Sequence, residues 1–357
     1  MNNLHLYGWS SFSPKISSSK NSYDHNQIGR VTSVKGHHYH IITSEGEQRA
    51  ELLGRLVVAY EKEDQPKVGD WVQFMKVDES SVFITEVLPR KNLLFRKTAG
   101  KEHATQVLAT NLDYAVVVQG LDQDFNLNRL ERYLVQIIGC GITPAVVLTK
   151  CDLISDKQYY LDEIKRLQRG AEVFFCSSQT GEGILELEMN LFKPGSTSVL
   201  VGSSGVGKSS LVNALLKEAA RAIDSISTST NKGKHTTTTR DMLMLANGAM
   251  LIDTPGMREF GLGVNENTDL GQQFPVIETY AQNCKFSDCS HTNEEGCAVL
   301  AAYASGELDA VIYDNYIKLM KEQQRFQTKA YERKQEQRQF GKMVRDVQKI
   351  KKRLKGK

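Results

Sequence analysis

The 357-residue sequence predicts a multidomain protein: an N-terminal OB-like β-barrel, an α/β domain built around a phosphate loop, and a C-terminal zinc-binding helical extension. Short β-branched runs separated by Gly and polar turns fill residues 28–88 and favour a small barrel. Strands then alternate with helical stretches, which is typical of a mostly parallel sheet covered by helices on both faces. Three cysteines and a histidine gather within residues 284–297 and predict the metal site.

Composition sets the expected boundaries of these parts. Residues 10–22 are rich in Ser and lack periodicity, so residues 1–25 are expected to form a flexible leader. The barrel is expected over residues 26–90, the α/β domain over 91–265 and the zinc-binding, basic helical part over 266–357. No apolar run reaches membrane-spanning length, no basic-then-apolar leader opens the sequence, and the cysteine pattern suits a reducing compartment. We therefore expect a cytoplasmic protein with no membrane partner.

Four strands are expected in the barrel, over residues 29–34, 39–43, 68–74 and 82–87. Barrels of this kind often bind RNA, but a barrel used only for packing or protein contact remains an alternative. A basic connector follows, and an RNA contact and a solvated linker explain it equally well. Its cations are Arg90, Lys91, Arg96, Lys97 and Lys101.

The α/β domain is expected to alternate strands with helices. The predicted helices cover residues 127–138, 157–167 and 184–191. The predicted strands cover residues 114–118, 145–149, 172–176, 198–201, 242–245 and 250–253.

A phosphate loop follows the strand at 198–201, with the full G-x-x-x-x-G-K-[ST] pattern and a helical stretch after it. Its glycines let backbone N–H groups turn toward phosphates, and the helix start adds a positive dipole end. Lys208 is expected to reach the β- and γ-phosphates as a catalytic group, and the Ser209 hydroxyl to ligate Mg²⁺. The predicted nucleotide contacts here are Gly202, Ser203, Ser204, Gly205, Val206, Gly207, Lys208, Ser209 and Ser210.

Two further stretches favour recognition of a guanine base. Thr149, Lys150, Cys151 and Asp152 end a strand, at the edge of the sheet where ligands bind. A carboxylate at Asp152 can accept hydrogen bonds from the N1 and N2 donors of guanine, whereas adenine has no matching pair. Ser177 and Ser178 follow the next strand and are expected to support the base.

Two more stretches favour contacts to Mg²⁺ and the γ-phosphate. Asp253 ends a strand and is expected to hold Mg²⁺ through water, with the N–H of Gly256 on the γ-phosphate. Residues 233–239 form a hydroxyl-rich loop from which Thr237 is expected to ligate Mg²⁺. Each stretch alone is a weak signal, but together with the phosphate loop they predict a GTPase that binds GTP and GDP.

The order of these motifs is unusual, because the base motif at 149–152 precedes the phosphate loop at 202–209. This circularly permuted order, with a barrel before it and a Cys/His cluster after it, resembles the RsgA family of small-ribosomal-subunit biogenesis GTPases. The resemblance implies a GTP hydrolase that acts on the small (30S) ribosomal subunit during late maturation, and it places GTP contacts at residues 149–152 and 202–210. The segment after residues 253–256 runs on toward the Cys/His cluster, so a partner bound there would reorder the loop that senses the γ-phosphate. We therefore expect a low intrinsic activity that the subunit stimulates, together with binding to rRNA. One position departs from the family pattern: Thr149 stands where Asn is usual, and its hydroxyl makes only part of an Asn side chain's contacts.

The residue that orients the attacking water must also differ from that of many GTPases. Met257 occupies the place, directly after Asp-x-x-Gly, where a Gln often performs this task. His235 is the candidate catalytic residue, because its imidazole can orient water or accept a proton near neutral pH, and the resemblance points to the same position. An RNA contact or a loop-stabilising role for His235 is the alternative.

The Cys/His cluster has the spacing of a closed tetrahedral site for one structural zinc ion, and this spacing also matches the zinc module of the resembled family. The predicted ligands are Cys284, Cys289, His291 and Cys297.

The tail is basic: residues 318–357 hold 15 Lys and Arg against 4 Asp and Glu, so they carry +11 while the rest of the chain carries −8. This asymmetry favours contacts to RNA phosphates over a merely solvated helix. We expect a monomer. Two other classes of function stay open: a nucleotide-gated RNA-binding module with incidental hydrolysis, and a phosphoryl transferase, for which no acceptor-activating motif is visible.

Overall fold

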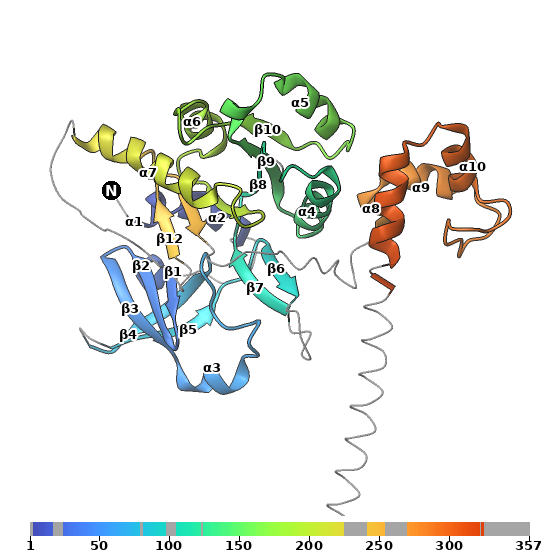
Figure 1. Ribbon diagram of the computed structural model, residues 1–357. Coiled ribbons are helices and arrows are strands. Elements are labelled where there is room, and N and C mark those ends of the chain that lie inside the picture. The colour runs from blue at the N-terminus through green and yellow to red at the C-terminus, as the bar shows by residue number, and fades with distance from the viewer. Residues whose placement is uncertain are drawn as a thin grey trace, which may run out of the picture. The chain divides into compact units, whose positions relative to one another are not determined.

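The computed structural model describes residues 3–16, 24–78, 81–97, 105–122, 124–224, 241–253, 270–321 and 323–324. The chain divides into two compact units, Met1–Leu262 and Gly263–Lys357, each with its own internal packing (Figure 1). The first unit contains the barrel and the α/β sheet, and the second contains the Cys/His cluster.

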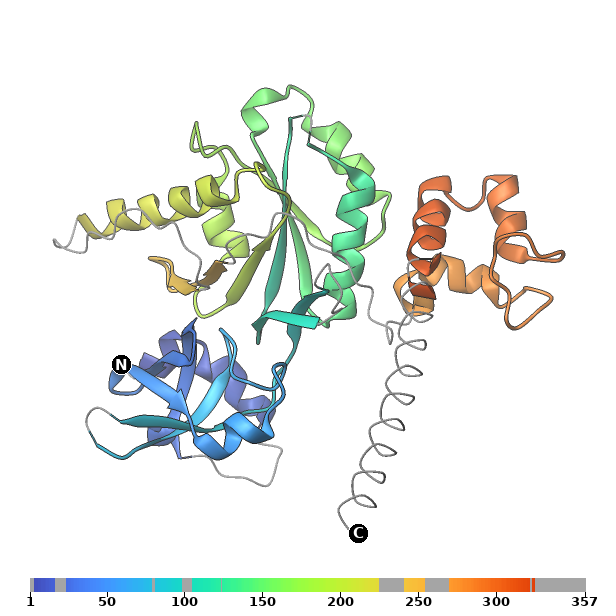
Figure 2. The ribbon, with the colours of Figure 1, turned by 60° about the horizontal axis from the view of Figure 1, so that its bottom comes forward.

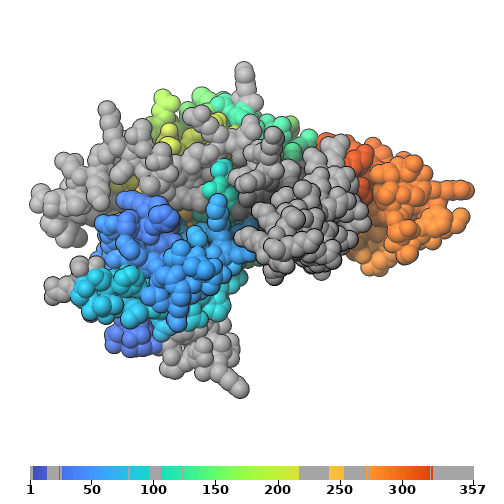
Figure 3. Space-filling view, turned by 90° about the horizontal axis from the view of Figure 1, so that it is seen from below, coloured from blue at the N-terminus to red at the C-terminus, as the bar shows by residue number. Residues whose placement is uncertain are grey.

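The barrel is a closed sheet of five strands, β1 (Ile28–Lys35), β2 (His38–Thr43), β3 (Gly46–Leu52), β4 (Trp71–Lys76) and β5 (Val82–Val87). The strands follow the order β1-β2-β3-β5-β4, and β4 pairs back to β1, so no edge strand is left. Side chains such as Val31, Ile41 and Ile84 fill the interior. The predicted OB-like barrel is confirmed, and its outer face is visible in blue and cyan in Figure 3.

Strand β3 and helix α3 (Gly54–Ala59) complete the barrel beyond the four predicted strands. In β3 only Ala50 and Leu52 are buried, and the other side chains face solvent or are half-buried. The mostly polar sequence of this strand therefore gave no clear strand signal, although it pairs with both β2 and β5.

The prediction of a flexible leader over residues 1–25 is wrong for residues 3–16. Helices α1 (Asn3–Leu6) and α2 (Trp9–Ile16) form there and bury Leu4, Trp9 and Phe12 against the barrel residue Trp71. The ring centroid of Trp71 lies 4.8 Å from that of Trp9 and 5.6 Å from that of Phe12. Burial of these large apolar side chains orders the segment despite its Ser-rich composition. Residues 17–23 lie outside the described part of the chain.

The basic connector is also more ordered than the sequence suggested. Strands β6 (Leu93–Lys97) and β7 (Thr105–Thr110) pair as an antiparallel hairpin that leads from the barrel to the next sheet (Figure 1). Buried Leu94 and Leu108 anchor this hairpin. Arg90 forms an ion pair with the fully buried Asp70, with 2.8 Å between Nη2 and Oδ2, so this cation has a structural role. Lys101 lies outside the described residues.

The α/β sheet has the order β10-β9-β8-β11-β13-β12. Five of these strands are parallel, and β12 (Asp241–Met244) runs antiparallel to β13 (Met250–Asp253). The predicted alternation of strands and helices is confirmed, with helices on both faces (Figure 2). The other strands are β8 (Tyr114–Gly120), β9 (Thr143–Thr149), β10 (Glu172–Phe175) and β11 (Thr197–Val201). The helices are α4 (Leu127–Gly139), α5 (Lys157–Lys165), α6 (Ile184–Glu186), the π-helical turn Leu187–Leu191 and α7 (Lys208–Asp224).

The barrel and the α/β sheet meet at two features. Strand β1 pairs with β12 through one register pair, Ser33 and Asp241. Beside it, Arg30 is buried and donates hydrogen bonds to Tyr7 O and, at 2.8 Å, to the Thr197 hydroxyl. Its guanidinium also stacks 5.1 Å from the ring centroid of Trp71. Burial lowers the pKa of Arg30 to about 10, so it stays charged at neutral pH.

The second unit contains α8 (Leu270–Gln273), α9 (Pro275–Ala281) and α10 (Ala298–Ser305), followed by a helical run over residues 310–321. Phe274, Ile277, Val299 and Leu308 are buried in it. The Cys/His cluster lies in the loop between α9 and α10. Within the described residues, no helix combines the length and apolarity needed to cross a membrane.

Candidate functional site

The candidate site lies at the carboxyl edge of the α/β sheet, where three parallel strands end side by side. Gly120 at the end of β8 pairs with Thr149 at the end of β9, and β8 also pairs with β11, which leads into the phosphate loop. This edge is where open α/β sheets bind ligands.

The phosphate loop runs from β11 into α7, as the motif predicts. Gly202 has φ 148°, and a Cβ atom placed on it would lie 2.3 Å from Val118 O. Only glycine fits this conformation and this close approach. Val206 is buried under the loop, while Ser204, Gly205, Ser209 and Ser210 are exposed. The exposed part of the loop and the first turn of α7 therefore face the side on which a nucleotide would bind.

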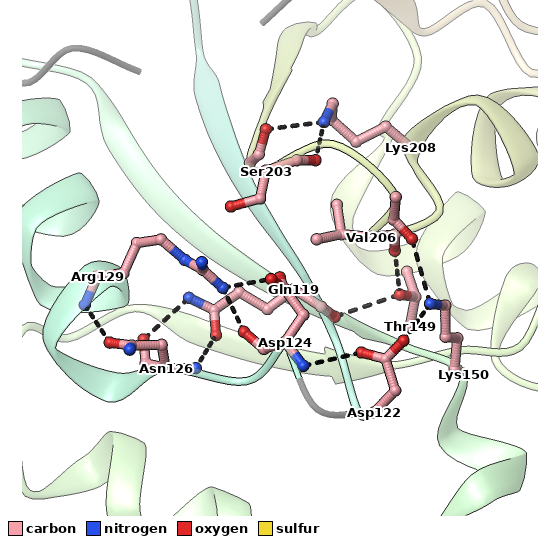
Figure 4. A network of polar contacts seen from close by, with 12 residues as sticks. Gln119, Asp122, Asp124, Asn126, Arg129, Thr149, Lys150, Ser203, Val206 and Lys208 are labelled. Atoms are coloured by element: carbon pink, nitrogen blue, oxygen red, sulfur yellow. Dashed lines mark hydrogen bonds and ion pairs between the residues drawn. The ribbon is translucent and has the colours of Figure 1, made fainter. Parts of the chain in front are cut away.

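Lys208 is the first residue of α7, and its ammonium group turns back over the loop. Nζ donates to Gly202 O at 2.7 Å and to Ser203 O (Figure 4). These contacts hold a positive charge above the loop, where helix α7 begins. The positive end of the helix dipole adds to this charge, so the loop is suited to an anion.

Thr149 links the base motif to the phosphate loop. Its hydroxyl lies within hydrogen-bonding distance of two carbonyl oxygens, those of Val206 and, at 3.2 Å, Gln119. A hydroxyl has one proton and so donates to one acceptor at a time, whereas an Asn amide has two N–H groups. With Thr149 in place of Asn, the side chain can therefore donate to either Val206 O or Gln119 O, but not to both at once.

The next residues of the base motif form a tight turn. Lys150 has φ 60°, and its Nζ donates to Gly205 O at 3.1 Å and pairs with the carboxylate of Asp122. Asp152 is exposed on the 3₁₀ turn Cys151–Leu153, so its carboxylate is free to meet a ligand. The turn therefore joins the phosphate loop to the predicted base-reading carboxylate.

Ser177 and Ser178 follow β10 in the neighbouring turn. The Ser177 hydroxyl accepts hydrogen bonds from the N–H groups of Gln179 and Thr180, both at 3.2 Å, so it shapes its own turn. Cys176 O accepts from Cys151 N–H at 3.2 Å and ties this turn to the base motif. Burial raises the pKa of the Cys176 thiol to about 12 and also raises that of Cys151, so both remain protonated thiols at neutral pH.

Several predicted site residues lie outside the described part of the chain. These are His235, Thr237, Gly256 and Met257. The backbone of Asp253 ends strand β13, which places this residue two strands from β8 in the sheet, but its side chain is also outside the description.

The structure adds three polar residues that the motifs did not include. Asp122 pairs with Lys150, and the side-chain amide of Gln119 exchanges hydrogen bonds with the backbone of Asn126 at 3.1 and 3.2 Å (Figure 4). Asn126 in turn caps the N-terminus of α4. Gln119 lies near the end of strand β8, and Asp122 and Asn126 lie in the loop that joins β8 to α4. The rule that ligands meet the carboxyl ends of parallel strands could have pointed to this loop from the sequence.

The four predicted metal ligands come together in the second unit, with their ligand atoms within 4.8 Å of one another. The sulfurs of Cys284 and Cys297 are 3.8 Å apart, and His291 Nδ1 lies 3.6 and 3.5 Å from them. Tetrahedral zinc with the usual bond lengths requires about 3.8 Å between two sulfurs and about 3.6 Å between sulfur and nitrogen. The donor atoms therefore fit a Cys₃His zinc site, with Nδ1 as the ligating nitrogen.

Hydrogen bonds hold the loop that carries these ligands. Tyr313 donates its hydroxyl to His291 O at 2.8 Å, where His291 has φ 56°. The Glu294 carboxylate accepts from the hydroxyl and N–H of Ser290 and from the N–H of Thr292. The hydrogen bonds from Ser290 are the main cause that lowers the pKa of Glu294 to about 2. Burial lowers the pKa of His291, which favours the neutral imidazole that binds metal.

Comparison with known proteins agrees with this architecture. Residues 87–263 match the family model described as RsgA GTPase. A protein of Bacteroides thetaiotaomicron named small ribosomal subunit biogenesis GTPase RsgA 1 is 40% identical over 352 residues, which cover 98% of both chains. A Listeria innocua protein of the same name is 42% identical over 321 residues, 89% of each chain.

Two solved structures are similar to this chain. YjeQ from Thermotoga maritima has a TM-score of 0.61 and 27% identity, covering 83% of this chain and 98% of its own. YloQ, described as a circularly permuted GTPase, has a TM-score of 0.59 and 26% identity, covering 85% of this chain and 98% of its own.

Proposed function

The chain belongs to the RsgA family of small ribosomal subunit biogenesis GTPases and is a GTP hydrolase; we propose that its reaction assists late maturation of the small (30S) subunit. In this proposal the protein acts in the cytoplasm as a monomer, binds rRNA, and hydrolyses GTP faster when the subunit is bound. The basic residues 318–357, with 15 Lys and Arg, are suited to rRNA phosphates.

The observation that carries the proposal is the direct contact between the base motif and the phosphate loop. Thr149 and Lys150 reach the carbonyl oxygens of Val206 and Gly205 although they precede the loop by more than fifty residues. A base bound by Asp152 would then lie a fixed distance from phosphates bound by residues 202–210. This arrangement supports a single site for a whole guanine nucleotide.

Each residue of the site has a chemical task in this proposal. The loop N–H groups and Lys208 bind the phosphates, and Lys208 exchanges its carbonyl acceptors for phosphate oxygens as it does so. The hydroxyls of Ser209 and Thr237 would hold Mg²⁺, with Asp253 acting through water, and the ion would offset the charge of the phosphates. Ser178 supports the base, and Gly256 donates its N–H to the γ-phosphate.

His235 orients the attacking water, because Met257 carries no group that can do so. Lys208 offsets the negative charge that develops on the phosphate oxygens as the bond to the leaving group breaks. The proposed reaction is therefore attack by water on the γ-phosphate, with no covalent intermediate on the protein.

Cys284, Cys289, His291 and Cys297 hold one structural zinc ion in this proposal, supported by the sulfur and nitrogen separations described above. Bound zinc would cross-link the loop between α9 and α10, with no ligand position open for chemistry.

Measurement of the GTPase rate with purified small and large ribosomal subunits tests the function. We expect multiple turnovers of GTP, slow for the protein alone and faster with the small subunit only. Equal rates with both subunits would contradict the proposed partner. A single turnover that leaves GDP bound would instead indicate a nucleotide-gated RNA-binding module.

A further inference from the structure

Asp122 connects the end of strand β8 to both halves of the nucleotide site. Its carboxylate forms an ion pair with Lys150, and Lys150 Nζ also donates to Gly205 O at 3.1 Å (Figure 4). Asp122, Lys150 and Gly205 thus form one chain of contacts across three segments of the fold. None of the nucleotide motifs contains Asp122.

We propose that Asp122 is a positioning residue for GTP and GDP binding, which holds the Lys150 ammonium on the phosphate loop before nucleotide arrives. The proposal rests on the proposed function, because it deepens the description of the same site. Asp122 acts through Lys150 and contacts no substrate atom itself.

The carboxylate of Asp122 is held in place from its other side. Its Oδ1 accepts a hydrogen bond from Asp124 N–H at 3.1 Å, and Leu121 N–H donates to Thr149 O at 2.9 Å. The side chains of Lys150 and Asp122 are 33% and 35% exposed, so their ion pair is partly shielded from water. The hydrogen bond from Lys150 lowers the pKa of Asp122, which keeps it ionised.

Gly120 gives independent support for the proposal, because any side chain at this position would enter the space that the ion pair of Asp122 and Lys150 occupies. A Cβ atom on Gly120 would lie 2.9 Å from Asp122 Oδ1 and 3.5 Å from Lys150 Nζ. The first distance is shorter than a van der Waals contact, so the carboxylate would have to move away. The absence of a side chain at the end of β8 therefore leaves room for this particular pair.

The need for such a link follows from the chemistry of Thr149 and Lys150. The hydroxyl of Thr149 has one proton and therefore serves one carbonyl oxygen at a time. Lys150 is the second side chain of the base motif that reaches the loop, so it carries the other contact between them. A lysine side chain has four rotatable bonds, and fixing it on binding is entropically unfavourable. Asp122 fixes it beforehand, which lowers this loss and favours nucleotide binding.

Binding of a fluorescent GDP analogue and steady-state GTP hydrolysis test the proposal in the full-length protein. The variants are Asp122→Ala, Lys150→Met, the double variant, and Asp122→Asn, which keeps an acceptor for the Asp124 N–H. We expect Asp122→Ala to raise the dissociation constant of GDP roughly threefold to fivefold, the range of a partly exposed ion pair. KM for GTP should rise by a similar factor while kcat stays unchanged. Glu163→Ala is the matched control, because it removes another partly exposed ion pair, with Arg166 at the C-terminal end of α5.

Coupling between the variants separates positioning from a general loss of stability. Asp122→Ala should have no further effect on GDP binding in the Lys150→Met background. Gly120→Ala should weaken binding in the parent protein but not in the Asp122→Ala background, where its clash is gone. If Asp122→Ala does not fold, Asp122→Asn and Gly120→Ala provide the same comparison.

The proposal would be overturned if Asp122→Ala weakened GDP binding equally in the parent and in the Lys150→Met background. Unchanged GDP affinity in Asp122→Ala would also overturn it, and so would an equally large loss of GDP affinity in Glu163→Ala. A parent protein that binds no guanine nucleotide would instead contradict the proposed function itself, so the two failures are distinguishable.

Discussion

Replacement of Arg30 by Met should weaken the junction between the barrel and the α/β sheet. Burial of the charge is unfavourable, and the nearby Asp113 and Asp70 offset it only in part. The net result is a pKa lowered from 12.5 to about 10, which corresponds to about 3 kcal/mol. Hydrogen bonds from a charged group contribute about 1.5–3 kcal/mol each. Arg30 makes two close ones, to Tyr7 O and the Thr197 hydroxyl, and two long ones, to Gly69 O at 3.4 Å and Asn111 O at 3.5 Å. A fifth, weaker one goes to Met250 Sδ at 3.2 Å.

The hydrogen bonds therefore outweigh the burial of the charge. Gly69 O keeps another donor in the variant, because the Asn111 side-chain amide lies 3.0 Å from it. Tyr7 O and the Thr197 hydroxyl lose their bond to Arg30, while the methionine fills most of the volume. We expect Arg30→Met to lower the free energy of unfolding by about 2 kcal/mol.

Urea unfolding followed by tryptophan fluorescence measures this change directly. The chain has two tryptophans, Trp9 and Trp71, and both lie in the aromatic cluster beside Arg30. Arg49→Met, at an exposed position on β3, is the control and should change the free energy by less than about 0.5 kcal/mol. An unfolding midpoint for Arg30→Met equal to or above that of the parent would refute the reasoning.

Three further predictions concern the nucleotide and metal sites. Asp152→Asn should move base preference from GTP toward XTP, because it reverses one donor–acceptor match; competition binding with unchanged GTP selectivity would remove Asp152 from base recognition. Cys289→Ser should lose zinc and loosen the second unit while GTP binding persists. A metal assay that finds about one zinc ion per chain in both the parent and the variant would contradict the site. His235→Ala should keep GTP binding within about threefold but lose most of the turnover stimulated by the small subunit, whereas Met257→Ala should do little; equal stimulated rates for His235→Ala and the parent would exclude this mechanism.

Local motifs made much of the fold and the site predictable. The phosphate loop and the Cys/His spacing are short patterns whose chemistry depends on neighbouring residues, and the strand and helix alternation around them is strongly periodic. The contacts between segments were not predictable in this way. Thr149 and Val206 are 57 residues apart and Lys150 and Asp122 are 28 apart, so only the paired ends of β8, β9 and β11 bring them together.

Composition is a poor guide where a distant partner decides the structure. The Ser-rich N-terminus contains Trp9 and Phe12, but their packing partner, Trp71, lies about sixty residues further along the chain. Strand β3 was missed for a related reason, because its pairing with β2 and β5 supplies hydrogen bonds that its polar side chains do not indicate.

The single register pair between Ser33 and Asp241 has a mechanical consequence. Asp241 begins β12, the strand that directly follows the hydroxyl-rich residues 233–239, and β12 pairs in turn with β13, which ends at Asp253. A displacement of the barrel would therefore be transmitted through β1 to β12. This strand lies in the sequence between residues 233–239 and Asp253, which are both expected to act near the γ-phosphate. If a partner bound at the barrel shifts β12 and thereby changes the affinity of the site for nucleotide, thermodynamic linkage requires nucleotide to change the affinity for that partner by the same factor.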